Sequence, residues 1–126
     1  MSSLVTESKT ALDAKRTLSK AVSRAANELG FSGLVLSKTL GVSQSTVSRL
    51  HSGNYLLKQG HKEWELGLLL IRLYRSLLSI VGDQHSAQIW MLSPNTGLGT
   101  APKDLIVETE GLVGVVNYLD GFRAQI

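Results

Sequence analysis

Residues 34–53 read LVLSKTLGVSQSTVSRLHSG, and their pattern predicts two short helices joined by a tight turn. Gly41 stands where a chain leaving a helix often needs a positive φ angle, and Ser43 follows at an N-cap position. In the second helix Val47 and Leu50 are three residues apart and fall on one stripe. The second helix is therefore expected to bury this stripe and to expose the opposite, polar face.

The polar side chains of the second helix have the chemistry needed to contact DNA bases. They are Gln44, Ser45, Thr46, Ser48 and Arg49. A helix that its partner helix holds across the DNA backbone can point its first residues at base edges in the major groove. Glutamine pairs with adenine, and arginine reaches guanine or phosphate. The alternative interpretation is a helical hairpin whose polar face is only solvated.

Three further polar residues flank this motif and suit phosphate contacts. They are Ser32, Lys38 and Asn54. The whole stretch closely resembles the helix-turn-helix of the Xre and phage-repressor class, in which a run such as GVSQSTVSRLHSG forms the turn and the recognition helix. This resemblance implies binding to double-stranded operator DNA.

Positive charge is concentrated in the first half of the 126-residue chain. Residues 1–60 contain eight Lys or Arg and three Asp or Glu, whereas residues 61–126 contain five and seven. A basic front half suits a polyanion, and a mildly acidic back half does not. Arg16, Lys20 and Arg24 recur every fourth residue and form a basic row, which either touches phosphates or is a solvated helix face.

Composition limits the classes of protein to which the chain can belong. The sequence has no cysteine, which excludes a disulfide framework, a thiolate metal site and a cysteine nucleophile. The start, MSSLVTESKT, lacks the basic and apolar segments of a secretory signal. The longest apolar stretch, residues 66–81, contains two arginines and is too short to span a bilayer. We expect a cytoplasmic protein without a membrane segment.

The sequence offers no arrangement typical of an enzyme. The three histidines, His51, His61 and His85, lie on different segments without metal-ligand spacing. Glu63 and Glu65 are two residues apart and diverge on a helix. We therefore expect neither a catalytic site nor a bound metal or cofactor.

Periodicity predicts an all-α fold in four parts. Residues 1–10 are predicted to be a mobile arm, 11–60 the helix-turn-helix module with a leading helix over 11–29, 61–82 a central helix, and 83–126 a small helical module whose last helix begins near Gly111. The central run WELGLLLIRLYRSLLSIV is apolar nearly all round. Such a helix needs cover on several sides, and we expect the front module, the back module and a second copy of the chain to supply it. A homodimer also suits an operator with two half-sites.

The back module contains candidate residues for contact with another protein. A glycine-flanked loop near Trp90, a residue type enriched in interfaces, can present polar groups, and polar and aromatic residues near the end share one helical face. The candidates are Asn95, Leu98, Gly99, Tyr118, Phe122, Arg123 and Ile126. Trp90 and Leu119 are expected to be buried within the chain, and Arg123 and the terminal residues to be exposed.

The order of residues in the back half resembles the toxin-binding domain of Xre/MbcA/ParS-type antitoxins. The resemblance rests on IVGD at 80–83, AQIWMLSPN at 87–95 and the following Leu98-Gly99. It implies an antitoxin that binds and neutralises a RES-domain toxin, an enzyme class that consumes NAD, and that represses its own operon. The NAD chemistry would belong to the partner.

The sequence departs from this family at two places. The loop reads Leu-Gly-Thr-Ala-Pro at 98–102, one residue shorter than the common Leu-Gly-Gly-x-Thr-Pro, and the chain ends FRAQI at 122–126 without the usual aromatic and glycine. A terminal segment that enters the toxin's active site would therefore carry different chemistry. The alternative function is a stand-alone dimeric transcriptional repressor whose C-terminal half only oligomerises.

Overall fold

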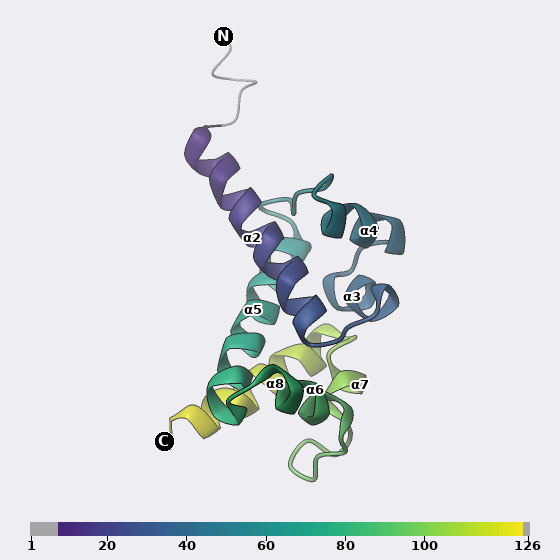
Figure 1. The fold of residues 1–126 in the computed structure, drawn as a ribbon, viewed down its shortest axis with the longest axis vertical. Coiled ribbons are helices and arrows are strands. Elements are labelled where there is room, and N and C mark those ends of the chain that lie inside the picture. Colours follow the sequence, from purple (N-terminus) through teal and green to yellow (C-terminus); the bar gives the residue numbers. More distant parts are fainter. Residues whose placement is uncertain (1–7, 125–126) are drawn as a thin grey trace.

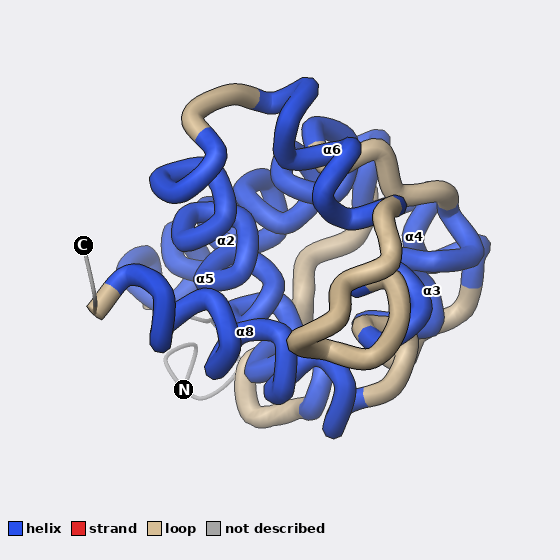
Figure 2. The backbone as a smooth tube through the Cα atoms, turned by 90° about the horizontal axis from the view of Figure 1, so that it is seen from below, coloured by secondary structure: helices blue, strands red, loops and turns tan. Residues whose placement is uncertain are grey.

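The computed structural model describes residues 8–124, and within that range the chain is all-helical, as the sequence predicts (Figures 1 and 2). The helices are α2 (Lys9–Glu28), α3 (Gly33–Leu40), α4 (Gln44–Ser52), α5 (Lys62–Val81), α6 (Gln84–Leu92), α7 (Pro102–Leu105) and α8 (Thr109–Arg123). Helices α3 and α4 form the predicted pair on one side of the molecule, beside α2, and α6, α7 and α8 gather at its lower end (Figure 1).

Two helices begin earlier than the sequence pattern indicates. Helix α2 starts at Lys9 rather than Ala11, because the Ser8 side chain accepts a hydrogen bond from the Ala11 amide at 3.1 Å and caps the first turn. The last two residues assigned to the arm are thus helical, and its first seven lie outside the described residues. Helix α8 starts at Thr109, two residues before Gly111.

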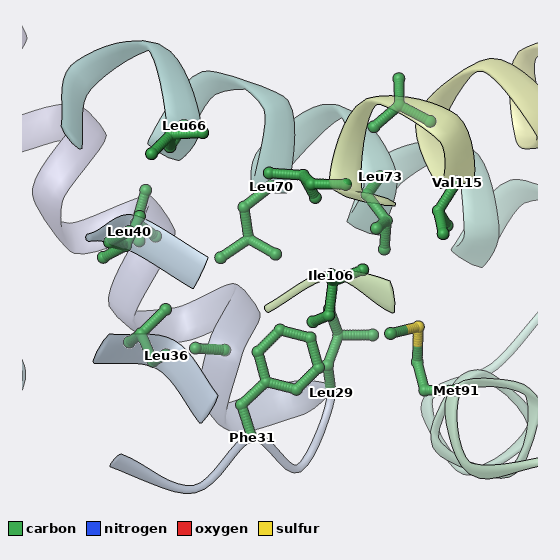
Figure 3. Close-up of a cluster of buried hydrophobic side chains, with 14 of the residues drawn as sticks. Leu29, Phe31, Leu36, Leu40, Leu66, Leu70, Leu73, Met91, Ile106 and Val115 are labelled. Atoms are coloured by element: carbon green, nitrogen blue, oxygen red, sulfur yellow. The ribbon is translucent and has the colours of Figure 1, made fainter. Parts of the chain in front are cut away.

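Helix α5 lies at the centre of the molecule and packs against α2, α3, α6 and α8. Its leucines at 66, 70, 73 and 77 recur at helical spacing, and all are buried. Figure 3 shows three of these leucines, Leu66, Leu70 and Leu73, among apolar side chains from both halves of the chain. The labelled members of the cluster are Leu29, Phe31, Leu36, Leu40, Leu66, Leu70, Leu73, Met91, Ile106 and Val115. The front and back of the chain therefore share one hydrophobic core.

The chain covers most of α5 by itself and leaves part of its apolar surface open. Trp64 and Leu69 are partly buried against the core, whereas Leu68 remains 46% exposed. The sequence led us to expect that a second copy covers this helix. Leu68 is the large apolar residue of α5 that the single chain leaves most exposed, so a second copy would have to cover it.

Polar contacts fix the end of α2 to the helices beside it. The Tyr74 hydroxyl of α5 donates a hydrogen bond to the Glu28 carboxylate, and this bond and partial burial raise the pKa of Tyr74. Gln88 of α6 donates through Nε2 to the Glu28 carbonyl oxygen at 2.8 Å. Among the described residues, no buried side-chain nitrogen or oxygen lacks a hydrogen-bond partner.

The turn between α5 and α6 combines a glycine and a capping carboxylate. Gly82 adopts φ 93°, a left-handed conformation that ends α5 without a Cβ penalty. Asp83 then accepts a hydrogen bond from the Ser86 amide at 2.7 Å, and this bond lowers the pKa of the Asp83 carboxyl. None of the helices within residues 8–124 has both the length and the apolar character needed to cross a membrane.

Gly111 permits the sharp connection between α7 and α8. A Cβ atom added at Gly111 would collide with the backbone carbonyl of Leu105, whereas a Cβ added at Gly114 would meet no atom within 4 Å. Both glycines lie in the same helix. The close approach at Gly111 therefore requires the absence of a side chain.

We expect Gly111→Ala to lower the free energy of unfolding by about 1–3 kcal/mol, because backbone must move to make room. Gly114→Ala is the matched control, and it should leave stability unchanged or raise it by up to about 1 kcal/mol through helix propensity. Urea unfolding followed by circular dichroism measures both. Equal effects of the two substitutions would contradict the packing described for Gly111.

Candidate nucleic-acid and protein interfaces

Helix α4 is presented at the surface by a turn whose geometry follows from its sequence. Gly41 ends α3 in a left-handed conformation with φ 71°, and Ser43 caps α4 by accepting a hydrogen bond from the Thr46 amide at 3.1 Å. Val47 and Leu50 are buried as predicted. The opposite face of α4 is therefore directed away from the core.

Four of the five polar side chains predicted on α4 are exposed, and Thr46 is partly buried. The exposed residues are Gln44, Ser45, Ser48 and Arg49. The Thr46 hydroxyl accepts hydrogen bonds from the Arg49 guanidinium at 3.2 Å and from the Ser43 hydroxyl at 2.9 Å. Thr46 thus orients Arg49 along the helix.

The three flanking residues are all exposed, and two of them already have roles within the chain. Ser32 caps α3, where its hydroxyl accepts a hydrogen bond from the Val35 amide at 3.2 Å. Asn54 donates to the Ser52 hydroxyl at 3.1 Å. Lys38 supplies a positive charge beside the turn.

The segment after α4 is fastened to α5, and the sequence pattern did not indicate this contact. The Tyr55 hydroxyl and the Lys58 amide both donate to one oxygen of Glu63, at 2.5 Å and 2.9 Å. Burial and the Glu63 carboxylate raise the pKa of Tyr55 to about 12. The Leu57 amide donates to the buried Ser19 hydroxyl at 2.8 Å. These bonds hold the segment after α4 against both α5 and α2.

In the back half, Asn95 organises its own loop. Its side-chain oxygen accepts hydrogen bonds from the amides of Gly97 at 2.8 Å and Leu98 at 3.2 Å, and its backbone oxygen accepts from the Gly99 amide at 2.8 Å. Leu98 packs partly against the core, and Gly99 is exposed. Asn95 therefore shapes the loop, and the exposed backbone around Gly99 is what the loop presents.

This loop lies against the Tyr118 side chain of α8, which in turn contacts Phe122. A Cβ atom added at Gly97 would lie 2.7 Å from the Tyr118 hydroxyl oxygen. Tyr118 and Phe122 contact each other edge to face, with ring centroids 4.9 Å apart and planes at 77°. Phe122 is 45% exposed. The fold thus brings the predicted loop and the predicted helix end together in one surface.

Polar contacts fasten the end of α8 to α5. Arg123 is exposed, as expected, and its guanidinium donates to the buried Ser76 hydroxyl at 3.2 Å. Arg72 forms an ion pair with Asp120. Ile126, the last predicted interface residue, lies outside the described residues.

The structure separates buried from exposed apolar residues in a way that the sequence only partly predicted. Leu119 is buried as expected, and Trp90 is partly buried against the core. Ile89 and Leu92 on α6 are 50% and 60% exposed. Sequence analysis did not single out this pair, because apolar residues three apart on a helix are more often core residues.

No group of three His, Cys, Asp or Glu side chains in the described part of the chain is placed to hold a metal ion. The two notable features are instead surfaces. One is the outward face of α4, and the other is the surface formed by the 95–99 loop, Tyr118 and Phe122. Their chemistry is that of recognition by hydrogen bonding and aromatic packing.

Comparisons with known proteins identify two family models that together cover most of the chain. Residues 9–72 match the antitoxin Xre-like helix-turn-helix domain, and residues 76–124 match the antitoxin Xre/MbcA/ParS C-terminal toxin-binding domain. A chain of the crystal structure of the M. tuberculosis MbcT-MbcA toxin-antitoxin complex is 25% identical with a TM-score of 0.63, and the match covers 86% of this chain and 96% of that chain. A search of curated proteins finds no match.

Proposed function

The chain belongs to the Xre-type antitoxins, and we propose that it neutralises a RES-domain, NAD-consuming toxin by direct binding and represses its own operon through α4. The observation that carries this proposal is the presence, on one core, of an outward polar recognition helix and a toxin-binding domain. In this proposal the NAD chemistry belongs to the toxin, so the antitoxin itself needs no catalytic group or cofactor. Both activities take place in the cytoplasm.

The proposed toxin-binding surface consists of the 95–99 loop, Tyr118, Phe122 and Arg123. Aromatic residues and arginine are the residue types most enriched at interface hot spots. The edge-to-face contact holds Phe122 in one orientation, and the Arg123 bond to Ser76 holds the helix end against α5. A surface that is ordered before binding loses less entropy when the partner docks.

The proposed DNA contacts come from the exposed face of α4. Gln44 and Ser45 stand in its first turn, where a recognition helix approaches base edges, and Arg49 follows one turn later. Ser32, Lys38 and Asn54 flank this face and are proposed to contact phosphates. The two hydrogen bonds to Glu63 limit the movement of the segment after α4 relative to α5.

We also propose that the chain forms a homodimer through the open face of α5. Glu65, Leu68, Leu69 and Arg72 line a shallow hollow on that face. When two copies of α5 pack antiparallel about the midpoint between 68 and 69, each Leu68 meets a Leu69 and each Glu65 meets an Arg72. This arrangement is self-complementary, as a two-fold interface requires. The Arg72 guanidinium has enough donors to serve this pair and Asp120 together.

The toxin proposal predicts that a RES-domain toxin is encoded beside the gene, and it is tested by co-expression of the two proteins. We expect a stable complex and restored growth with the wild-type antitoxin, and Phe122→Ala should weaken the complex at least about tenfold. Val113→Ala on the same helix removes another exposed apolar side chain and should bind normally. If the wild-type chain gives neither a stable complex nor restored growth, the toxin proposal is refuted and the stand-alone repressor is favoured.

The base-reading proposal is tested by replacing Gln44 or Arg49 with Ala. Either change should cost about 1–3 kcal/mol on the cognate site and little on random duplex DNA, since base-edge hydrogen bonds discriminate between sequences. Fluorescence anisotropy with DNA from upstream of the gene gives both affinities. Equal losses on the two duplexes would show that these side chains touch only the phosphates.

The dimer proposal is tested by Leu68→Glu. The substitution desolvates two like-charged carboxylates close to the two-fold axis, which should weaken dimerisation at least about tenfold. Val113→Glu adds the same charge at an exposed apolar site on α8 and serves as the control. Sedimentation equilibrium measures the monomer fraction, and an unchanged dimer in Leu68→Glu would place the interface elsewhere.

A further inference from the structure

A basic groove runs beside the recognition helix, between α2 and the end of α4. Its volume is about 530 Å³, and its lining includes Arg16, Lys20 and Ser23 from α2 and His51 from α4. We propose that this groove binds the sugar-phosphate backbone of double-stranded DNA next to the bases that α4 contacts. The inference rests on the proposed DNA-binding function and extends the contact surface to α2.

The groove is continuous with the face of α4 that is proposed to contact bases. Gln44, Ser48 and His51 are spaced by four and three residues, so they follow one another along one stripe of the helix. His51 stands at the end of this stripe, where its Nδ1 lies 2.6 Å from the Ser23 hydroxyl of α2. A DNA strand that follows the edge of α4 is thereby brought to α2.

The positive charge of the groove is open to a ligand. Arg16 and Lys20 are exposed and lie one turn apart on α2. The ion pairs among the described residues are Arg24–Glu28 and Arg72–Asp120, so neither groove cation is neutralised by a carboxylate there. The groove lining contains no Asp or Glu. Its net charge therefore favours an anion.

The dimensions of DNA explain why a sugar-phosphate backbone would pass along this groove when α4 occupies the major groove. The major groove is about 12 Å wide and is bordered by phosphates on both sides. A helix that occupies it has phosphates along each of its edges, and long basic side chains beside the helix reach them. The Ser23 hydroxyl and the His51 ring add short polar groups to the lining of the groove. Such contacts set the orientation of the protein and carry no sequence information.

The test is the salt dependence of DNA binding by the Arg16→Ala, Lys20→Ala double variant. The slope of log K against log salt concentration is negative, and each phosphate that is no longer neutralised reduces its magnitude by about 0.9. We therefore expect the magnitude of the slope to decrease by about 2, equally on DNA from upstream of the gene and on a random duplex, with the affinity ratio between them unchanged. Gln44→Ala should show the opposite pattern, with a changed ratio and the wild-type slope.

Two matched variants separate a local contact from net charge. Arg75→Ala, Lys103→Ala removes the same charge from α5 and α7, outside this groove, and should keep the wild-type slope. Arg16→Lys, Lys20→Arg preserves the charge in the groove and should also keep it. Circular dichroism melting confirms that each variant is folded.

The outcomes distinguish this inference from the function on which it rests. A wild-type slope in the Arg16→Ala, Lys20→Ala variant, or an equal loss in the Arg75→Ala, Lys103→Ala variant, overturns the groove as a backbone site and leaves base contacts by α4 intact. A wild-type protein that binds neither duplex overturns the DNA-binding proposal itself.

Discussion

Burial of the α5 leucine stripe is the interaction on which the rest of the structure depends. Leu66 and Leu70 lie toward the helices of the front half, and Leu73 lies toward Ile106 and Val115 of the back half (Figure 3). Leu77 is buried one turn after Leu73 on the same stripe. Removing apolar area of this size from water is the largest favourable contribution available to a chain without cysteine. Because one helix serves both halves, neither half has a separate core. The two family matches accordingly meet inside α5, one ending at residue 72 and the other beginning at 76.

Apolar packing is non-directional, so polar contacts are needed to fix the orientation of the segments that pack on α5. Glu63 receives two hydrogen bonds from the segment after α4, while Ser76 and Arg72 hold the end of α8. All three acceptors or donors lie on α5. The proposed DNA surface and the proposed toxin surface are thus both positioned from the same helix. This shared support gives a physical route by which a change at one surface could affect the other, because a shift of α5 moves both.

The distribution of charge agrees with this division of roles. Arg16, Lys20, Lys38 and Arg49 all belong to the front half, where the proposed ligand is a polyanion. The surface at the end of α8 relies on aromatic packing and on a loop stabilised by its own hydrogen bonds. Each surface therefore has the chemistry that its proposed partner requires, and the two do not compete for the same side chains.

Much of this organisation is determined by local sequence. Gly41, Ser43 and the Val47–Leu50 spacing define the turn and the buried stripe of α4, because caps and helical periodicity depend on residues within one or two turns. The limits of α5 also follow from its sequence, with Gly82 and Asp83 ending the apolar run. The local pattern was less accurate where a cap or a close contact lies outside the apolar repeat, as at Ser8 and at the start of α8.

Tertiary structure alone decided the relations between distant segments. No local pattern indicates that Glu63 accepts the Tyr55 and Lys58 bonds or that Arg123 binds Ser76. These contacts depend on how helices cross, and crossing is set by the complementary packing of many side chains at once. The basic row that includes Arg16 and Lys20 is visible in the sequence. Its position beside the recognition helix is not, because it depends on the packing of α2 against α4.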